Sequence, residues 1–385
     1  MTNFVAYNPV KLVFGRGTIA EIAKEIPAGT RVLMVYGGGS IKKNGVYEQV
    51  LKALGACAVT EFGGIEPNPR YETCMKAVEV CRKEKIQFLL AVGGGSVLDG
   101  TKFIAVAAKY GRGDPWNVME GRAPIEKALP LGCVMTLPAT GSEMNTFAVI
   151  SRDSTNEKQA FSSPHVFPKF SILDPQTTFS LPRKQTANGI VDTFVHVMEQ
   201  YMCDVDSAPL TERMAESVLQ TIIEDGPKVL RNPRNYQSRA SVMWCATVGL
   251  NGWLGLGAAA QDWATHMIGH ELTAIYGLDH ARTLAIIMPA VHRFMLKRKQ
   301  IRMAQYGRRV WGLKGTDRAV AAKAVEKTET FFRQLGFKTK LSENGIEWPG
   351  AGIQVAARLS ARGCRIGEAA DIGENEVLSI FELAK

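Results

Sequence analysis

Three of the six histidines in this 385-residue chain lie within one short stretch, Gln261–His280. His266 and His270 are four residues apart, so a helix would place both imidazoles on one face. His280 follows after a predicted turn at 275–278. A single pair of histidines at this spacing is common on exposed helix faces, so further ligands are needed before a metal site is indicated.

Asp192 and His196 provide such ligands, because they are also four residues apart on a predicted helix. Two helical pairs and one further histidine can converge on one divalent metal, and imidazole with one carboxylate suits Zn²⁺ or Fe²⁺. The metalloprotease pattern His-Glu-x-x-His is absent, since Glu271 directly follows His270. His165 and His292 receive no role and are expected at the surface or as satisfied polar groups.

Two glycine clusters indicate a second kind of chemistry. Gly37-Gly38-Gly39-Ser40 and Gly93-Gly94-Gly95-Ser96 each follow an apolar run and open a helix. Such turns let the backbone approach a pyrophosphate, and the helix adds the positive end of its dipole. Asp99 lies near the start of the second helix. We therefore expect a dinucleotide site at the carboxyl ends of these strands.

The first glycine cluster also bears on cofactor choice. NAD-preferring sites commonly use an acidic residue to bind the ribose 2′-hydroxyl. The turn Tyr36–Ser40 holds no carboxylate, and Lys42 and Lys43 follow it. This composition favours a 2′-phosphate and hence NADP(H).

The elements that must position these residues fall into two types. Apolar runs alternate with helical periods in the first half, which predicts an α/β dinucleotide-binding, Rossmann-like domain over residues 1–182. Its expected strands are 31–36, 57–62, 87–92 and 132–137, after a strand pair within 4–14 and a short helix that Thr18 caps. Residues 183–385 have almost entirely helical periods, which predicts an all-α metal-binding and catalytic domain. Residues 336–385 carry no recognisable motif.

Composition excludes several classes of protein. The chain is 46% hydrophobic and 22% charged, as in ordinary soluble globular proteins. No apolar run is long enough to span a membrane, and seven unpatterned cysteines indicate reduced thiols in a cytoplasm. The net charge of +9 is densest at 296–302, which is typical of a solvated helix face, so no nucleic-acid partner is expected.

Taken together, the motifs resemble the iron-containing, or group III, alcohol dehydrogenases along the whole chain. The similarity is greatest to the branch of NADPH-dependent aldehyde reductases and butanol dehydrogenases. It rests on Gly93-Gly94-Gly95-Ser96-x-x-Asp99, Thr136-Leu137-Pro138-Ala139-Thr140-Gly141-Ser142-Glu143, Asp192-x-x-x-His196, His266-x-x-x-His270 with His280, and Glu66-Pro67-Asn68-Pro69.

This resemblance implies a role for each matched residue. The metal ligands would be Asp192, His196, His266 and His280, with His270 beside them as a candidate proton relay. The cofactor contacts would come from Gly93, Gly94, Gly95, Ser96, Asp99, Thr136, Thr140, Ser142 and Lys158, with Asn68 and Leu181 near the adenosine. The family also implies an active site between the domains, a metal that polarises the substrate carbonyl, and hydride transfer from the nicotinamide.

Two further expectations concern substrate and partners. The residues around the histidines (Phe194, Trp263, Thr265, Met267, Ile268) are largely apolar, which favours small neutral aldehydes over phosphorylated sugars. Glycerol-dehydrogenase-like and dehydroquinate-synthase-like metalloenzymes of the same fold remain the alternative. The apolar-rich segment Asn3–Phe14 predicts an edge strand and a homodimer.

Overall fold

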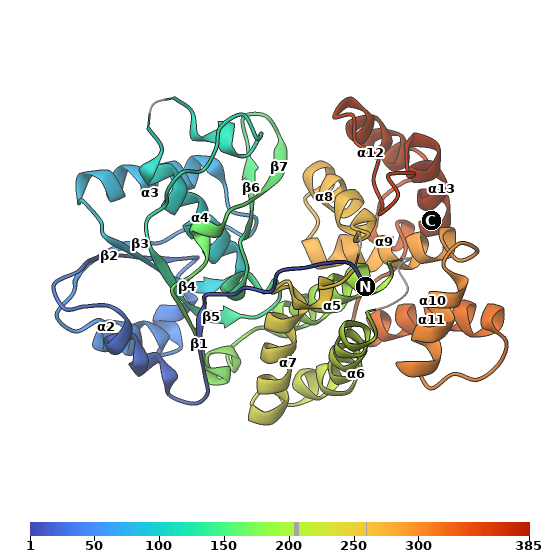
Figure 1. The fold of residues 1–385 in the computed structure, drawn as a ribbon, viewed down its shortest axis with the longest axis horizontal. Coiled ribbons are helices and arrows are strands. Elements are labelled where there is room, and N and C mark those ends of the chain that lie inside the picture. Colours follow the sequence, from blue (N-terminus) through green and yellow to red (C-terminus); the bar gives the residue numbers. More distant parts are fainter. Residues whose placement is uncertain (112, 204–207, 259) are drawn as a thin grey trace. The chain divides into compact units, whose positions relative to one another are not determined.

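A computed structural model of the chain describes residues 1–111, 113–203, 208–258 and 260–385. Two compact units divide these residues (Figure 1). One unit comprises Tyr7–Pro182 and Pro233–Thr247 and contains the β sheets. The other comprises Met1–Ala6, Arg183–Asn232 and Val248–Lys385 and is helical. The chain passes between the units after residue 182, and the two shorter segments, 1–6 and 233–247, each belong to the unit that lies mainly on the other side of that point.

A six-stranded parallel sheet forms the centre of the first unit, in the order β1-β8-β5-β4-β2-β3. Its strands are β1 Lys11–Phe14, β2 Arg31–Tyr36, β3 Ala58–Phe62, β4 Phe88–Gly94, β5 Leu131–Leu137 and β8 Phe170–Leu173. β4 and β5 are neighbours within the sheet, and their apolar residues are buried on both faces. The α/β fold and its four main strands are confirmed.

Helices cover both faces of this sheet, and alternate residues of each strand point to opposite sides. Leu33 and Val35 of β2 belong to a core beneath the helices α3 and α4, while Val32 and Met34 face α2. The helices of this unit are α1 Ile22–Glu25, α2 Val46–Leu54, α3 Tyr71–Lys83, α4 Gly95–Lys109 and most of α7 Tyr236–Gly249. An antiparallel hairpin, β6 Phe147–Arg152 with β7 Glu157–Ser162, lies outside the main sheet.

Two local predictions near the N-terminus are wrong. The expected strand pair within 4–14 is a single strand, β1, which pairs with β8 rather than with a preceding segment. Pro9 has no amide hydrogen to donate to a sheet, which opposes an earlier strand. Thr18 does not cap a helix, because its hydroxyl donates to Gly15 O at 2.9 Å and Gly17 takes the cap position in a left-handed conformation.

The helical unit confirms the predicted helices of the second half. It contains α5 Arg183–Tyr201, α6 Pro209–Arg231, α8 Ala264–Tyr276, α9 His280–Phe294, α10 Gln300–Arg309, α11 Asp317–Gln334, α12 Gly350–Ala361 and α13 Glu374–Ala384. Short 3₁₀ helices over both units span Thr18–Glu21, Ser40–Lys43, Pro115–Val118, Ser142–Met144, Pro164–Val166, Pro175–Thr178, Trp253–Gly255 and Ser342–Asn344. In the part of the chain that the structure describes, no helix has the length and hydropathy of a membrane span.

Candidate functional site

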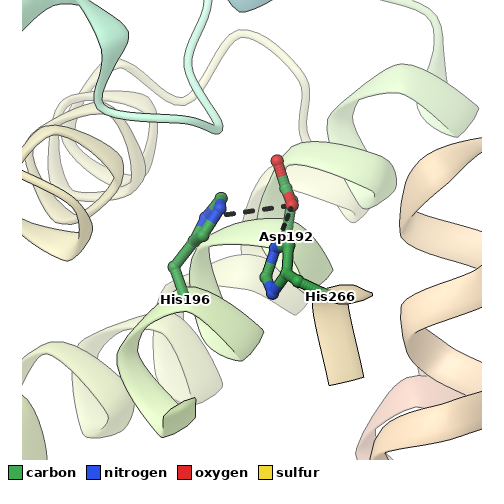
Figure 2. Close-up of side chains that lie close together, drawn as sticks. All are labelled: Asp192, His196 and His266. Atoms are coloured by element: carbon green, nitrogen blue, oxygen red, sulfur yellow. Dashed lines mark ion pairs between the residues drawn. The ribbon is translucent and has the colours of Figure 1, made fainter. Parts of the chain in front are cut away.

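Helix α5 places the first two candidate ligands. Asp192 and His196 are one turn apart and each is only 5% exposed, so both side chains lie in the interior of the helical unit. Asp192 Oδ1 lies 3.8 Å from His196 Nδ1. Figure 2 shows this carboxylate between His196 and a second imidazole, that of His266.

Helices α8 and α9 bring the other two histidines to the same carboxylate. His266 Nε2 of α8 lies 3.8 Å from Asp192 Oδ1, and His280 Nε2 lies 3.6 Å from it. The turn between the helices makes this possible, because Gly277 ends α8 with a φ of 66°, which glycine adopts without strain. α9 then begins at His280 itself.

The donor set fits a divalent cation of the zinc or iron type. Ligand atoms of Asp192, His196 and His266 all lie within 4.8 Å of one another. Among the described residues, Asp192 Oδ1 and His266 Nε2 are buried without a hydrogen-bond partner. Leaving a buried polar atom unsatisfied costs about 1–3 kcal/mol. Two such atoms that point toward each other beside further imidazoles are accounted for by a bound metal.

His270 lies next to this cluster, one helical turn after His266. Its ring centroid is 6.1 Å from that of His266 and 5.1 Å from that of His280. Trp263 lies on another side, with ring centroids 5.5 Å from His266 and 6.3 Å from His196.

Fewer apolar side chains are exposed around the candidate metal ligands than the sequence suggests. Phe194 and Ile268 are fully buried, and Phe194 packs on Phe331 and Phe332 in the helical core. Thr265 is also buried, at 1% exposure. Trp263, in contrast, is half-buried, and its ring lies beside two of the candidate ligands.

In the sheet unit, the second glycine cluster allows very close packing at the end of β4. A Cβ atom at Gly93 would lie 2.5 Å from Val97, one at Gly94 2.8 Å from Leu137, and one at Gly95 2.5 Å from Thr140. Only glycine fits these positions. These glycines are therefore required by close packing at the start of α4, the helix end at which a pyrophosphate would be expected.

Several predicted cofactor residues meet around α4. Lys158 Nζ donates to Asn68 Oδ1 at 2.9 Å, and Asn68 N donates to Ser96 Oγ at 3.4 Å. Asp99 accepts from Ser142 Oγ at 2.7 Å and from the backbone of Val149 at 3.0 Å. Both carboxylate oxygens of Asp99 therefore hold neighbouring segments in place.

The remaining predicted contacts lie along the same edge of the sheet. Thr136 and Thr140 are at and just beyond the end of β5, and Thr140 Oγ1 accepts from Ser142 N at 3.2 Å. Leu181 is half-buried and follows Ser180, whose hydroxyl accepts from Asn44 at 3.0 Å. No described contact joins Leu181 to Asn68.

A carboxylate on the neighbouring strand pairs with Lys42, which follows the turn after β2, and sequence reasoning missed this contact. Glu61, at the end of the adjacent strand β3, accepts from Tyr36, Lys42 and Tyr47, with Lys42 Nζ at 2.9 Å. Lys42 is therefore already paired with a carboxylate. The adjacency of β2 and β3 creates this contact, and spacing along the chain does not reveal it.

Two family models match the chain on either side of the predicted boundary. Residues 9–175 match the iron-containing alcohol dehydrogenase model, and residues 186–384 match the C-terminal model of the Fe-containing alcohol dehydrogenase family. The chain belongs to the iron-containing alcohol dehydrogenase family.

Individual relatives within the iron-containing alcohol dehydrogenases cover the full chain. It is 52% identical to the NADPH-dependent aldehyde reductase YqhD of Escherichia coli, over 100% of both chains. It is 43% identical to a probable NADH-dependent butanol dehydrogenase of Bacillus subtilis, over 99% of both. Among solved structures, the NADH-dependent butanol dehydrogenase A of Thermotoga maritima has a TM-score of 0.95 at 37% identity, covering 100% of this chain and 99% of that one.

In this iron-containing alcohol dehydrogenase, the segment 336–385 contacts helix α8, which carries the candidate ligand His266. Glu271 of α8 accepts from Arg358 Nε of α12 at 2.5 Å and from Arg362, the residue that follows α12, at 2.7 Å. Asp262 lies just before α8 and accepts from the backbone N–H of Ala264, the first residue of that helix, at 3.0 Å. Its other oxygen accepts from the buried Lys299 at 2.9 Å.

A buried carboxylate beside the metal ligands was also missed by sequence reasoning. Glu199 accepts from His266 N at 3.1 Å and contacts His266 Nδ1. Burial by itself lowers the pKa of His266. The opposing effect of the carboxylates of Glu199 and Asp192 is larger, so the pKa is raised to about 9. The signal was present in the sequence, because Asp192, His196 and Glu199 follow the spacing i, i+4, i+7 of one helix face.

Proposed function

We propose that this chain reduces small neutral aldehydes to alcohols with NADPH, through one divalent metal bound by Asp192, His196, His266 and His280. The chain is a metal-dependent, NADP(H)-linked alcohol dehydrogenase of the aldehyde reductase type. The observation that carries the ligand assignment is the pair of buried, unsatisfied atoms, Asp192 Oδ1 and His266 Nε2, which lie 3.8 Å apart.

The side chains around the metal have separable tasks. When bound, the metal supplies Lewis-acid polarisation of the substrate carbonyl oxygen. Asp192 contributes the negative charge that offsets part of the cation's charge, and the histidines contribute neutral donors. Their helices are packed in the core, so the donors are held in place before any metal arrives.

His270 is the proposed proton donor. It is half-buried and lies beside the ring of His280, at 5.1 Å between centroids. An imidazole at this position can deliver a proton to the alcohol oxygen directly or through one water. Trp263 presents an apolar surface next to the ligands, which suits unbranched or aromatic aldehydes.

The proposed NADPH site lies along the carboxyl edge of the sheet. The glycine turn Gly93–Ser96 would bind the pyrophosphate at the N-terminus of α4. Lys158, which is held by Asn68, adds a positive charge near it. The glycine turn after β2 would receive the 2′-phosphate, with Ser40 and Lys43 as donors. Some relatives are named for NADPH and others for NADH. Because the two cofactors differ by the 2′-phosphate, this turn is the proposed determinant of cofactor choice.

Elemental analysis combined with NADPH oxidation over an aldehyde panel tests this function. We expect one metal per chain and activity on unphosphorylated aldehydes. Asp192→Asn and His266→Ala should lose the metal and the activity but keep the fold by circular dichroism. His165→Ala is the matched control at a histidine outside the cluster. Full metal occupancy in both ligand variants would refute the ligand set, and activity confined to phosphorylated substrates would favour the synthase-like alternative.

We also propose a homodimer that forms through the sheet edge at β1. Among the described strands, β1 is terminal in the sheet order and pairs only with β8. An edge strand offers its free backbone groups to another chain. A monomer by light scattering at micromolar concentration would contradict this. Each of the seven cysteines, all of which the structure describes, is a thiol rather than half of a disulfide, which supports the proposed cytoplasmic location.

A further inference from the structure

Glu199 is the buried carboxylate nearest to the proposed ligands that no role above accounts for. It lies one turn after His196 on α5 and is 3% exposed. Its two oxygens have different partners on the same residue. Oε1 accepts the backbone N–H of His266 at 3.1 Å, and Oε2 contacts Nδ1 of the His266 ring.

The backbone contact fixes the start of helix α8. His266 is the third residue of α8, and its N–H is one of the first amides, which have no partner within the helix. Trp263 at the cap position provides no side-chain hydrogen bond to these amides. Glu199, which is 67 positions away in the chain, satisfies this amide from a different helix. A negative charge at this end also interacts favourably with the helix dipole.

The ring contact determines which imidazole nitrogen is available. A carboxylate can only accept a hydrogen bond, so Nδ1 of His266 carries the hydrogen that Glu199 binds. When the imidazole gives up its other proton, the lone pair is therefore on Nε2, which is buried, lacks a hydrogen-bond partner among the described residues, and lies 3.8 Å from Asp192 Oδ1. Outer carboxylates that fix a ligand histidine in this way are common in metal sites.

We infer that Glu199 is a positioning residue of the metal centre, which sets both the tautomer of His266 and the place of its ring through one carboxylate. This inference rests on the proposed assignment of His266 as a ligand. It does not give Glu199 a contact with metal or substrate.

Glutamine at this position provides a sharp test, because Glu199 must accept two hydrogen bonds. An amide has one accepting oxygen and one donating NH₂ group. If the NH₂ faces the backbone N–H of His266, two donors oppose each other. If it faces Nδ1, the ring proton must move to Nε2, which removes the lone pair that a metal needs. Either orientation weakens the site.

The experiment measures the affinity of the purified protein for Zn²⁺ by competition with a chromogenic chelator, for wild type and Glu199→Gln. The dissociation constant should rise roughly 10- to 100-fold. Glu216→Gln is the matched control, since Glu216 is a buried carboxylate of the same unit that bonds Tyr201 and Arg309 instead. The control should lower the melting temperature of the metal-free protein without changing the Zn²⁺ affinity.

Three outcomes separate the inference from the function on which it rests. If His266→Ala keeps wild-type Zn²⁺ affinity, the ligand assignment itself fails. If His266→Ala loses the metal while Glu199→Gln keeps it, the positioning role is refuted. Should Glu199→Gln not fold, ¹⁵N-histidine spectra of the Zn²⁺-loaded wild type decide: we expect the hydrogen of His266 on Nδ1, and a hydrogen on Nε2 would overturn the inference.

Discussion

Replacing Gly38 by aspartate should convert cofactor preference, and the structure shows why this position can accept the change. A Cβ atom at Gly38 would have no heavy atom within 4 Å, and its φ lies outside the left-handed region. The two neighbouring glycines are unsuitable. A Cβ at Gly37 would lie 3.2 Å from Ile65 O, and Gly39 has a φ of 84°.

The expected magnitude follows from charge. A charge-assisted hydrogen bond to the 2′-phosphate is worth about 1.5–3 kcal/mol. A carboxylate placed ~5 Å from the phosphate adds repulsion of about 0.8 kcal/mol per unit charge in water. Because Lys42 is already paired with Glu61, the lower end of this range applies. The dissociation constant for NADPH should rise roughly tenfold, and up to a hundredfold if Ser40 or Lys43 loses its contact as well.

The assay is a fluorescence titration of the metal-loaded protein with NADPH and with NADH. Gly38→Asn is the matched control, because it has nearly the same shape as aspartate without the charge. NADH affinity should stay within about threefold, and the loss of NADPH affinity should shrink with added salt. Equal weakening of both cofactors would indicate a distorted turn, and unchanged NADPH affinity would show that the phosphate binds elsewhere. Either result refutes the reasoning.

Three further predictions concern stability. Burial, with Lys299 nearby, lowers the pKa of His292 to about 4. Below pH 6.5 the unfolded chain therefore binds a proton that folded His292 does not, so the free energy of unfolding should fall by ~3 kcal/mol between pH 6.5 and 4. Urea titrations of His292→Gln should show a shallower fall with pH. A pH dependence identical to that of the wild type would contradict this. Glu271→Gln should cost about 1–3 kcal/mol in urea unfolding by weakening the contacts with Arg358 and Arg362, with Glu326→Gln at the surface as a neutral control. Chelation of the metal should lower the melting temperature, and Zn²⁺ should restore it in proportion to RT ln(1 + [Zn²⁺]/Kd); a melting temperature independent of Zn²⁺ would argue against a site that exists only in the folded chain.

The central strands and the candidate metal ligands could be predicted because each has a local signal. β2, β4 and β5 are continuous apolar runs that end in glycine or hydroxyl-rich turns, and burial on both faces explains that composition. Asp192 and His196 share a helix face by spacing alone. Their convergence with His266 and His280 through the turn at Gly277 depends on how the helices pack. The spacing of these residues is compatible with that convergence but does not determine it.

The parts that were missed depend on contacts between distant segments. β8 has only four residues and β7 is largely polar and half-exposed, so neither has a strong apolar pattern, while the apolar part of β6 is only the four residues 147–150. Glu61 reaches Lys42 because β2 and β3 are neighbours in the sheet. Glu199 reaches His266 because α5 lies beside α8. Such pairings are decided by topology rather than by spacing along the chain.

The path of the chain between its two compact units has a consequence for how such a protein can be divided. The chain passes from one unit to the other four times, after residues 6, 182, 232 and 247, and the last passage lies inside helix α7. A gene cut after residue 182 would give one fragment without 233–247 and another without the first six residues. The first fragment would lose Met243, which is buried in the core of the sheet unit. Recombination that exchanged the cofactor half of one family member for that of another would therefore have to carry α7 with it.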